Sequence, residues 1–130
     1  MVEESQDGVA VINQPAGHLE PGESLLEAVV RETLEETAWQ FTPEALTGVY
    51  RWVHPRKDRT YLRFCFCGRV HGHSPERELD EGIIAAHWLS REQMLQRSLR
   101  SPMVLRSIDD YLAGQRVPLS LCADLLPAED

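Results

Sequence analysis

The sequence predicts a single α+β domain in which short strands alternate with amphipathic helices. Its 130 residues fall within the roughly 100–200 residues usual for one domain. Hydrophobic residues make up 42% of the chain and charged residues 26%, which is typical of a globular protein. Strand-type and helix-type segments alternate along the chain with no internal repeat or linker. We therefore expect one compact unit over residues 1–130, with a loose end at residues 127–130.

Four segments have the composition of β-strands: Gly8–Ile12, Leu46–Val53, Thr60–Val70 and Ile83–Leu89. The second and third are rich in aromatic and β-branched residues, which favour extended backbone. The basic loop of residues 54–59 separates them, so we predict a hairpin.

Two capping boxes and one proline predict the helix starts. Ser24 and Glu27 have the spacing in which each side chain accepts a backbone N–H at a helix start, and we expect a helix from Leu25 to Glu36. Ser90 and Gln93 repeat this pattern before a short helix that runs through about Gln96. A last helix is expected to begin at Pro102 and to end before Gly114, because apolar residues recur between them at helical spacing.

Charge and hydropathy exclude several classes of partner. The chain has 21 acidic and 13 basic residues, and a net charge of -8 repels a long nucleic acid. No stretch approaches the roughly 18 apolar residues that cross a membrane. The first residues are acidic and do not resemble a signal peptide, so we expect a cytoplasmic protein.

Three glutamates share one face of the first predicted helix. Glu32, Glu35 and Glu36 are three and four residues apart, so their carboxylates project together. Like charges at this spacing cost a helix roughly 0.2–0.5 kcal/mol per pair. On an ordinary helix they would simply form a solvated face. The alternative is that the three carboxylates bind a divalent cation of the magnesium type, which prefers oxygen ligands.

The surrounding segment favours the cation. It reads Gly17-x5-Glu23-x7-Arg31-Glu32-Thr33-Leu34-Glu35-Glu36-Thr37-Ala38-Trp39 and resembles the Nudix box, G-x5-E-x7-R-E-U-x-E-E-x-G-U. The resemblance implies a Nudix fold, an α/β/α sandwich with a mixed sheet between helices. It also implies Mg²⁺ or Mn²⁺ bound by Glu32, Glu35 and Glu36, with the backbone carbonyl of Ala16.

The resemblance further implies structural roles within the motif for Gly17, Glu23 and Arg31. In such boxes the arginine orients the glutamates, and the first glutamate braces the loop against the helix. Two positions depart from the pattern. Ala38 replaces the late glycine, and a β-carbon in a left-handed residue costs roughly 1–2 kcal/mol, so the helix exit is expected to change shape. Trp39 replaces an aliphatic residue.

The start of the chain is a larger departure. Nudix domains place at least one central strand before the box, and this sequence reaches Gly17 almost at once. The sheet is therefore expected to lack its N-terminal strand. Two alternatives follow: the sequence begins inside a longer natural protein, or another chain fills the gap by exchange or edge pairing, as in a homodimer.

The resemblance extends beyond the box and is strongest to the NudJ-type phosphatase branch. The residues concerned are Asn13–Glu20, Arg51-Trp52, Leu62–Phe64, Trp88 and Arg100–Pro102. This branch implies release of phosphate from nucleoside di- and triphosphates or from the pyrimidine pyrophosphate precursor of thiamine. A small diphosphate-containing metabolite or nucleotide is the expected partner.

Outside the box, Arg51 and Arg63 are predicted to bind substrate, because guanidinium groups pair with phosphate oxygens. Trp52 is a candidate for stacking on a nucleobase, with a core position as the alternative. Trp88 is assigned to the core. Asp80 and Glu81 precede the last predicted strand, where Nudix enzymes often supply another carboxylate as base or ligand from a mobile loop. Glu81 is the candidate selected.

The mechanism implied is metal-assisted attack of water on phosphorus. The general base is either a glutamate of the box or Glu81, and spacing does not decide between them. Two other interpretations remain open. One is a Nudix-fold protein that binds a nucleotide or acts as a regulator without turnover, and the other is an acidic protein-interaction domain with no metal.

Overall fold

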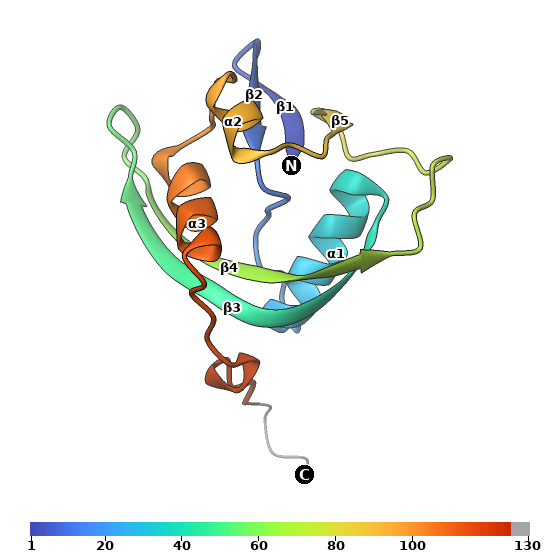
Figure 1. The fold of residues 1–130 in the computed structure, drawn as a ribbon, viewed down its shortest axis with the longest axis vertical. Helices are drawn as coiled ribbons and strands as arrows, with labels where there is room; N and C mark the ends of the chain where they lie inside the picture. The colour runs from blue at the N-terminus through green and yellow to red at the C-terminus, as the bar shows by residue number, and fades with distance from the viewer. Residues whose placement is uncertain (126–130) are drawn as a thin grey trace.

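A computed structural model describes residues 1–125, and the expected loose end at residues 127–130 lies outside that range. The chain forms two antiparallel sheets with helices beside them (Figure 1). In chain order the elements are β1 (Val2–Gln6), β2 (Val9–Asn13), α1 (Leu25–Thr37), β3 (Gln40–Val53), β4 (Thr60–His71), β5 (Ile83–Ala86), α2 (Arg91–Leu95), α3 (Pro102–Leu112) and a short 3₁₀ turn, Leu119–Leu121.

The first sheet has the order β2-β1-β5. The prediction of no strand before Gly8 is wrong, because residues 2–6 form β1, and two strands therefore precede the Gly17 loop. Asp7 and Gly8 join β1 to β2 with φ angles of 50° and 80°. Positive φ at both central residues is typical of the tight two-residue turn of hairpins, and the Asp-Gly dipeptide favours that turn. That dipeptide was the available signal for the missed strand.

The second sheet is the predicted hairpin, β3 with β4, and Trp52 lies opposite Tyr61 in its register. β3 starts six residues earlier than expected, at Gln40, because irregular pairing between Pro43 and Ala45 lets the strand continue past the proline. The α+β class is confirmed. The strands within each sheet are antiparallel. An isolated parallel bridge joins Ile12 to Leu99.

The helices follow the predicted boundaries closely. Both capping boxes form, at Ser24 and at Ser90. Figure 1 shows the curved β3–β4 hairpin on one side, the sheet β2-β1-β5 on the other, and α1 and α3 flanking the space between them. Both of these helices contact β3. Within residues 1–125, no helix is long and apolar enough to span a membrane.

Among the described residues, the buried apolar side chains form a short list: Val2, Val11, Ile12, Ala38, Leu46, Met94, Met103 and Val104. Trp88 is absent from it, and the assignment of this residue to the core is wrong. Its side chain is 74% exposed and makes an edge contact with Trp39, because β5 ends at Ala86, before the tryptophan.

Candidate active site

The loop from β2 to α1 runs directly over the acidic face of the helix. Gly17 sits in this loop, and a β-carbon there would fall on the carboxylate of Glu32. Glycine is therefore required by close approach rather than by an unusual φ angle. The loop and the helix are in contact at the point where the carboxylates gather.

Arg31 ties the loop to the helix. Its Nε donates to Glu23 Oε2 at 2.6 Å and its Nη2 donates to Glu23 Oε1 at 2.9 Å, so the pair is bidentate. Nη2 also donates to the backbone carbonyl of His18. The hydrogen bonds from Arg31 lower the pKa of Glu23, and those to Glu23 raise the pKa of the guanidinium above its ordinary value. The bracing role proposed for Glu23 and the orienting role of Arg31 fit this geometry.

The same guanidinium reaches the acidic face. Nη1 of Arg31 donates to Glu32 Oε1 at 2.7 Å and to Glu35 Oε2 at 3.2 Å. Each of these bonds engages one oxygen of a carboxylate. The remaining carboxylate oxygens stay available to a cation while the side chains are held in place.

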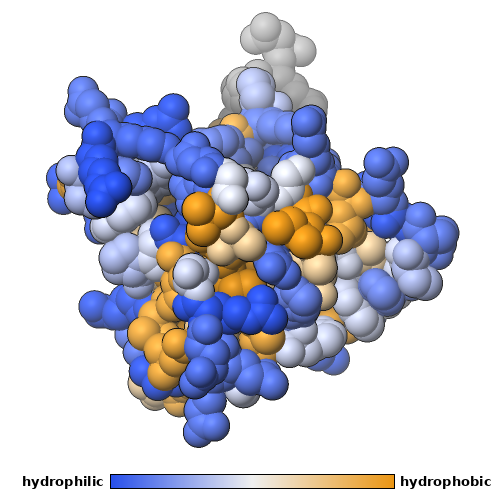
Figure 2. Space-filling model, turned by 90° about the horizontal axis from the view of Figure 1, so that it is seen from above, coloured by the Kyte–Doolittle hydropathy of each residue, from blue (hydrophilic) through white to orange (hydrophobic). Residues whose placement is uncertain are grey.

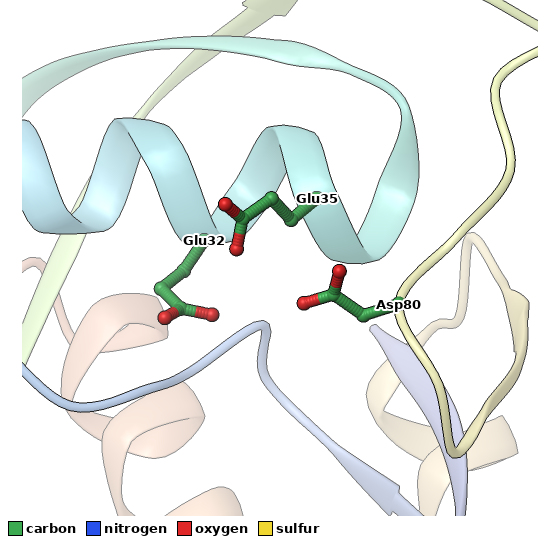
Figure 3. A group of neighbouring side chains, drawn as sticks. All are labelled: Glu32, Glu35 and Asp80. Carbon is green, nitrogen blue, oxygen red and sulfur yellow. The ribbon is translucent and has the colours of Figure 1, made fainter.

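Glu32 and Glu35 converge on Asp80. One carboxylate oxygen from each of the three residues lies within 4.8 Å of the others. Figure 3 shows the two glutamates projecting from α1 and Asp80 facing them from the loop between β4 and β5. The backbone N–H of Asp80 donates to the carbonyl of Glu35 at 3.0 Å, which fixes this loop to the end of α1.

Glu36 lies apart from that trio, on the loop side of the helix. Only 5% of its surface is exposed, and its two oxygens accept the backbone N–H of Ala16 at 3.2 and 3.3 Å. Burial raises the pKa of Glu36 to about 8, with the charges of Glu32, Glu4 and Asp80 adding to the shift. Without a cation, this carboxyl group holds a proton near neutral pH.

A polar pocket continues from the acidic face toward α3. Nη1 of Arg63 donates to Asn13 Oδ1 at 3.1 Å and to Gln14 Oε1 at 3.0 Å. Gln14 in turn donates to Ser107 Oγ at 2.7 Å. Burial lowers the pKa of the Arg63 guanidinium. Its hydrogen-bond partners in the described chain are neutral amides, so its positive charge is available to an anion.

Aromatic residues line the far part of this pocket. Trp52 stacks on Tyr61 with ring centroids 5.5 Å apart, and both rings lie on the Arg63 face of the hairpin. Arg51 is exposed on the opposite face, since strand side chains alternate. The structure therefore brings Arg63 and Trp52 together and leaves Arg51 outside the pocket.

Asp80 is a member of the acidic cluster, whereas its neighbour Glu81 is the residue selected from the sequence. Glu81 is exposed and lies outside the trio. Both residues belong to a loop whose position depends on β4, β5 and α1 together. No local sequence pattern distinguishes which of two adjacent acids turns toward the helix.

The chain is similar to known proteins in both sequence and structure. The sequence profile of the NUDIX domain family matches residues 1–107. The chain belongs to the Nudix family. The curated protein Phosphatase NudJ of Escherichia coli strain K12 is 42% identical over 125 residues, which cover 95% of this chain and 81% of that protein. The Phosphatase NudJ of Shigella flexneri matches to the same extent.

Solved structures agree with the sequence matches. A Nudix hydrolase from Nitrosomonas europaea superposes with a TM-score of 0.93 at 46% identity, covering 95% of this chain and 86% of that one. A MutT protein from Methanosarcina mazei Go1 shares the fold, with a TM-score of 0.64 at 23% identity, covering 88% of this chain and 83% of that one. The protein is thus a Nudix hydrolase homologous to the NudJ phosphatases. Divalent-metal dependence is general in this family, and the Nudix box provides two of the three residues of the acidic cluster, Glu32 and Glu35.

Proposed function

We propose that this Nudix hydrolase releases phosphate from a small diphosphate-bearing substrate, either a nucleoside di- or triphosphate or the pyrimidine pyrophosphate precursor of thiamine. The observation that supports this most directly is the convergence of Glu32, Glu35 and Asp80, together with a half-buried Arg63 that lines the same pocket as Glu32 and has neutral amides as its hydrogen-bond partners. The carboxylates can bind the cation, and the guanidinium of Arg63 can bind the phosphate.

The acidic trio has the donor chemistry of a magnesium site. Oxygen ligands of Mg²⁺ lie roughly 2.1 Å from the ion, so ligands on opposite sides are about 4.2 Å apart. The carboxylate oxygens of Glu32, Glu35 and Asp80 are within 4.8 Å of one another, so small side-chain rotations bring them to that spacing. We propose Mg²⁺ or Mn²⁺ as the cofactor, with the Ala16 carbonyl and Glu36 as further candidate ligands.

The roles of the side chains follow from their positions. A bound divalent ion supplies charge neutralisation of the phosphate and lowers the pKa of water. Arg31 keeps Glu32 and Glu35 oriented, and Gly17 lets the loop approach them. Glu32, Glu35, Glu36 and Glu81 are the candidate proton acceptors, and each of them becomes testable by replacement with glutamine.

The substrate extends from the metal toward β4 in this proposal. Arg63 donates to a phosphate oxygen, and its present bonds to Asn13 and Gln14 keep it aimed into the pocket. The stacked pair of Trp52 and Tyr61 offers an aromatic surface to a nucleobase or pyrimidine ring. Arg51, on the opposite face, has no substrate role in this arrangement.

The test is a phosphate-release screen over nucleoside di- and triphosphates and pyrimidine pyrophosphates, with Mg²⁺ or Mn²⁺. Asp80→Asn and Glu35→Gln are expected to lower activity by at least about tenfold and to abolish the rise in Tm that a bound ion causes. Glu78→Gln is the matched control, because Glu78 is exposed in the same loop. Glu36→Gln and Glu81→Gln separate the candidates for the base.

Two outcomes would contradict parts of the proposal. Full activity and an unchanged metal response in Asp80→Asn would remove Asp80 from the ion site. Binding of nucleotides without phosphate release by the unmodified chain would favour a Nudix-fold binding protein instead.

A further inference from the structure

Asp80 belongs to a segment that buries little apolar surface of its own. Residues 72–82 connect β4 to β5 as a loop at the edge of the molecule in Figure 1, and Figure 2 shows mainly hydrophilic side chains at the margins of the face. Leu79 is the only large apolar residue of this connection, and it is half-buried. A loop with few buried contacts opens easily. Specific contacts with the rest of the chain therefore hold Asp80 beside the glutamates of α1.

The C-terminal end of α1 provides two of these contacts. The last carbonyl groups of a helix have no N–H partner within the helix. Here the carbonyl of Glu35 accepts the N–H of Asp80 at 3.0 Å, and the carbonyl of Ala38 accepts the N–H of Ser74 at 3.0 Å. Among the described residues of its last turn, α1 has no basic side chain that could take their place. The β4–β5 connection thus caps the helix that carries the acidic cluster.

Trp39 adds side-chain contacts on both sides of this connection. Its ring stacks on His73, with centroids 4.5 Å apart and an angle of 20° between the planes. It also meets Trp88 edge-on, with a centroid distance of 6.0 Å and an angle of 75°. His73 lies near the start of the connection, and Trp88 follows β5, which ends at Ala86. One side chain, placed directly after the helix cap, therefore contacts the chain both before and after Asp80.

The stack and the first backbone bond are adjacent. Trp39 follows Ala38 and His73 precedes Ser74, so the rings pair next to the hydrogen bond between Ala38 and Ser74. Aromatic pairs of this kind stabilise by the equivalent of roughly a two- to tenfold change in an equilibrium constant. Loss of the ring of His73 is expected to raise the open fraction of the loop by a similar factor.

We propose that Trp39 is a positioning residue, which clamps the β4–β5 connection through His73 and Trp88 and thereby holds Asp80 at the ion site. The role of Asp80 as a ligand rests on the proposed function, whereas the clamp depends only on contacts within the chain. The clamp sets how often the third carboxylate is in place. It therefore governs the affinity for the ion rather than the rate of the metal-loaded enzyme.

A purely structural role for Trp39 leads to different expectations. Loss of packing lowers Tm, but it does not change the metal affinity of the molecules that remain folded. It also acts equally whether residue 80 is an aspartate or an asparagine. His73 is the better site for substitution, because its side chain is exposed and its loss should disturb the fold little.

The test measures Mn²⁺ binding to variants of His73, alone and combined with Asp80→Asn. His73→Ala is expected to weaken binding by about three- to tenfold, and saturating Mn²⁺ should restore kcat to within about twofold. His73→Tyr keeps a ring against Trp39 and should regain most of the affinity. In the Asp80→Asn background, His73→Ala should change the affinity by less than about twofold. His71→Ala is the matched control, because His71 is exposed and contacts Thr42 within the hairpin.

Hydrogen exchange gives a readout that needs neither metal nor substrate. In the metal-free protein, His73→Ala is expected to speed exchange of the Ser74 and Asp80 amides by at least about threefold, because both are bonded to the end of α1. The amide of Val117 donates to the carbonyl of Leu46, outside this region, and should exchange at the same rate in both proteins.

Three results would overturn the proposal. One is unchanged exchange of the Ser74 and Asp80 amides in His73→Ala. Another is an equal loss of Mn²⁺ affinity from His73→Ala with and without Asp80→Asn, because the stack would then act through other residues. The third is a His73→Tyr variant that binds Mn²⁺ no better than His73→Ala. Failure of the proposed ion site is distinguishable, since Asp80→Asn would then leave Mn²⁺ affinity unchanged, while the exchange rates still decide whether the clamp exists.

Discussion

Gly17 and Glu32 share one small volume: the carboxylate of Glu32 occupies the position that a β-carbon at residue 17 would need. Gly17→Ala is therefore expected to push the Glu32 carboxylate out of the acidic cluster. Displaced supporting contacts typically cost metal sites about 10–100-fold in affinity or activity, and we expect a loss in that range. Titration of Mn²⁺ binding together with phosphate release measures it.

A double-mutant cycle provides the control for this steric argument. Glu32→Asp shortens the side chain by one methylene and should itself weaken the site, but it withdraws the carboxylate from the position of the new β-carbon. The effects of Gly17→Ala and Glu32→Asp are then less than additive. Strict additivity would show that the two residues do not compete for space.

Ala38 ends α1 in a left-handed conformation, with φ 63° and its N–H donating to the Leu34 carbonyl. The left-handed cap is retained with alanine in place of glycine, so the predicted change in the shape of the helix exit is wrong. Ala38 adopts the left-handed conformation despite its β-carbon. Ala38→Gly is expected to raise the free energy of unfolding by about 1 kcal/mol. Ala38 is buried, so the lost methyl offsets part of the gain. Urea denaturation measures the difference, and a clear loss of stability would mean that packing of the methyl outweighs the strain.

Arg31 contacts Glu23, Glu32 and Glu35 at once, and lysine cannot reproduce that geometry. Arg31→Lys should lower both Tm and metal affinity, with the loss of affinity showing that the glutamates are no longer oriented. Arg91→Lys is the matched control, since Arg91 pairs with Asp109 at the surface, where ion pairs contribute little. Equal losses of Tm in the two variants would argue against a special role for Arg31.

The parts of this protein that sequence predicts well are those governed by short-range spacing. The capping box at Ser24 and the i, i+3 spacing of Glu32 and Glu35 define α1 and its acidic face without any tertiary information. The spacing also placed Glu36 on this face, whereas the structure buries it against the Ala16 loop, apart from the cluster. The hairpin register is different, because a basic loop of several residues separates its strands. Arg51 and Arg63 look equivalent in the sequence, and only the register with Tyr50 and Leu62 shows that they face opposite sides.

Asp80 and β1 were missed for different physical reasons. Asp80 reaches the cluster through a loop held by its backbone bond to Glu35, which is a contact between segments far apart in the sequence. β1 was predictable in principle, since Asp7-Gly8 followed by Val9 and Val11 is a hairpin signal. Glu3 and Glu4 masked it, because acidic residues are uncommon in strands.

The buried carboxyl of Glu36 makes stability depend on pH in an unusual direction. Its pKa is raised to about 8 in the folded chain, while an unfolded glutamate titrates near 4.5. Between pH 4.5 and pH 8 the folded state binds one more proton at Glu36 than the unfolded state does. The contribution of this proton to the free energy of unfolding is complete below pH 4.5 and is lost as pH rises through 8. Metal-free protein should therefore lose stability from about pH 5 to pH 8, by at most roughly 1.4 kcal/mol per pH unit from this group.

Glu36→Gln isolates that contribution, because glutamine keeps the shape of the side chain and does not titrate. Urea denaturation in a chelating buffer at several pH values should show a flatter profile for the variant than for the unmodified chain. Divalent metal should flatten the profile of the unmodified chain as well, since a cation beside Glu36 favours its charged form. Parallel profiles for the two proteins without metal would place the titrating group elsewhere, and Asp80→Asn would then test whether the acidic trio is responsible.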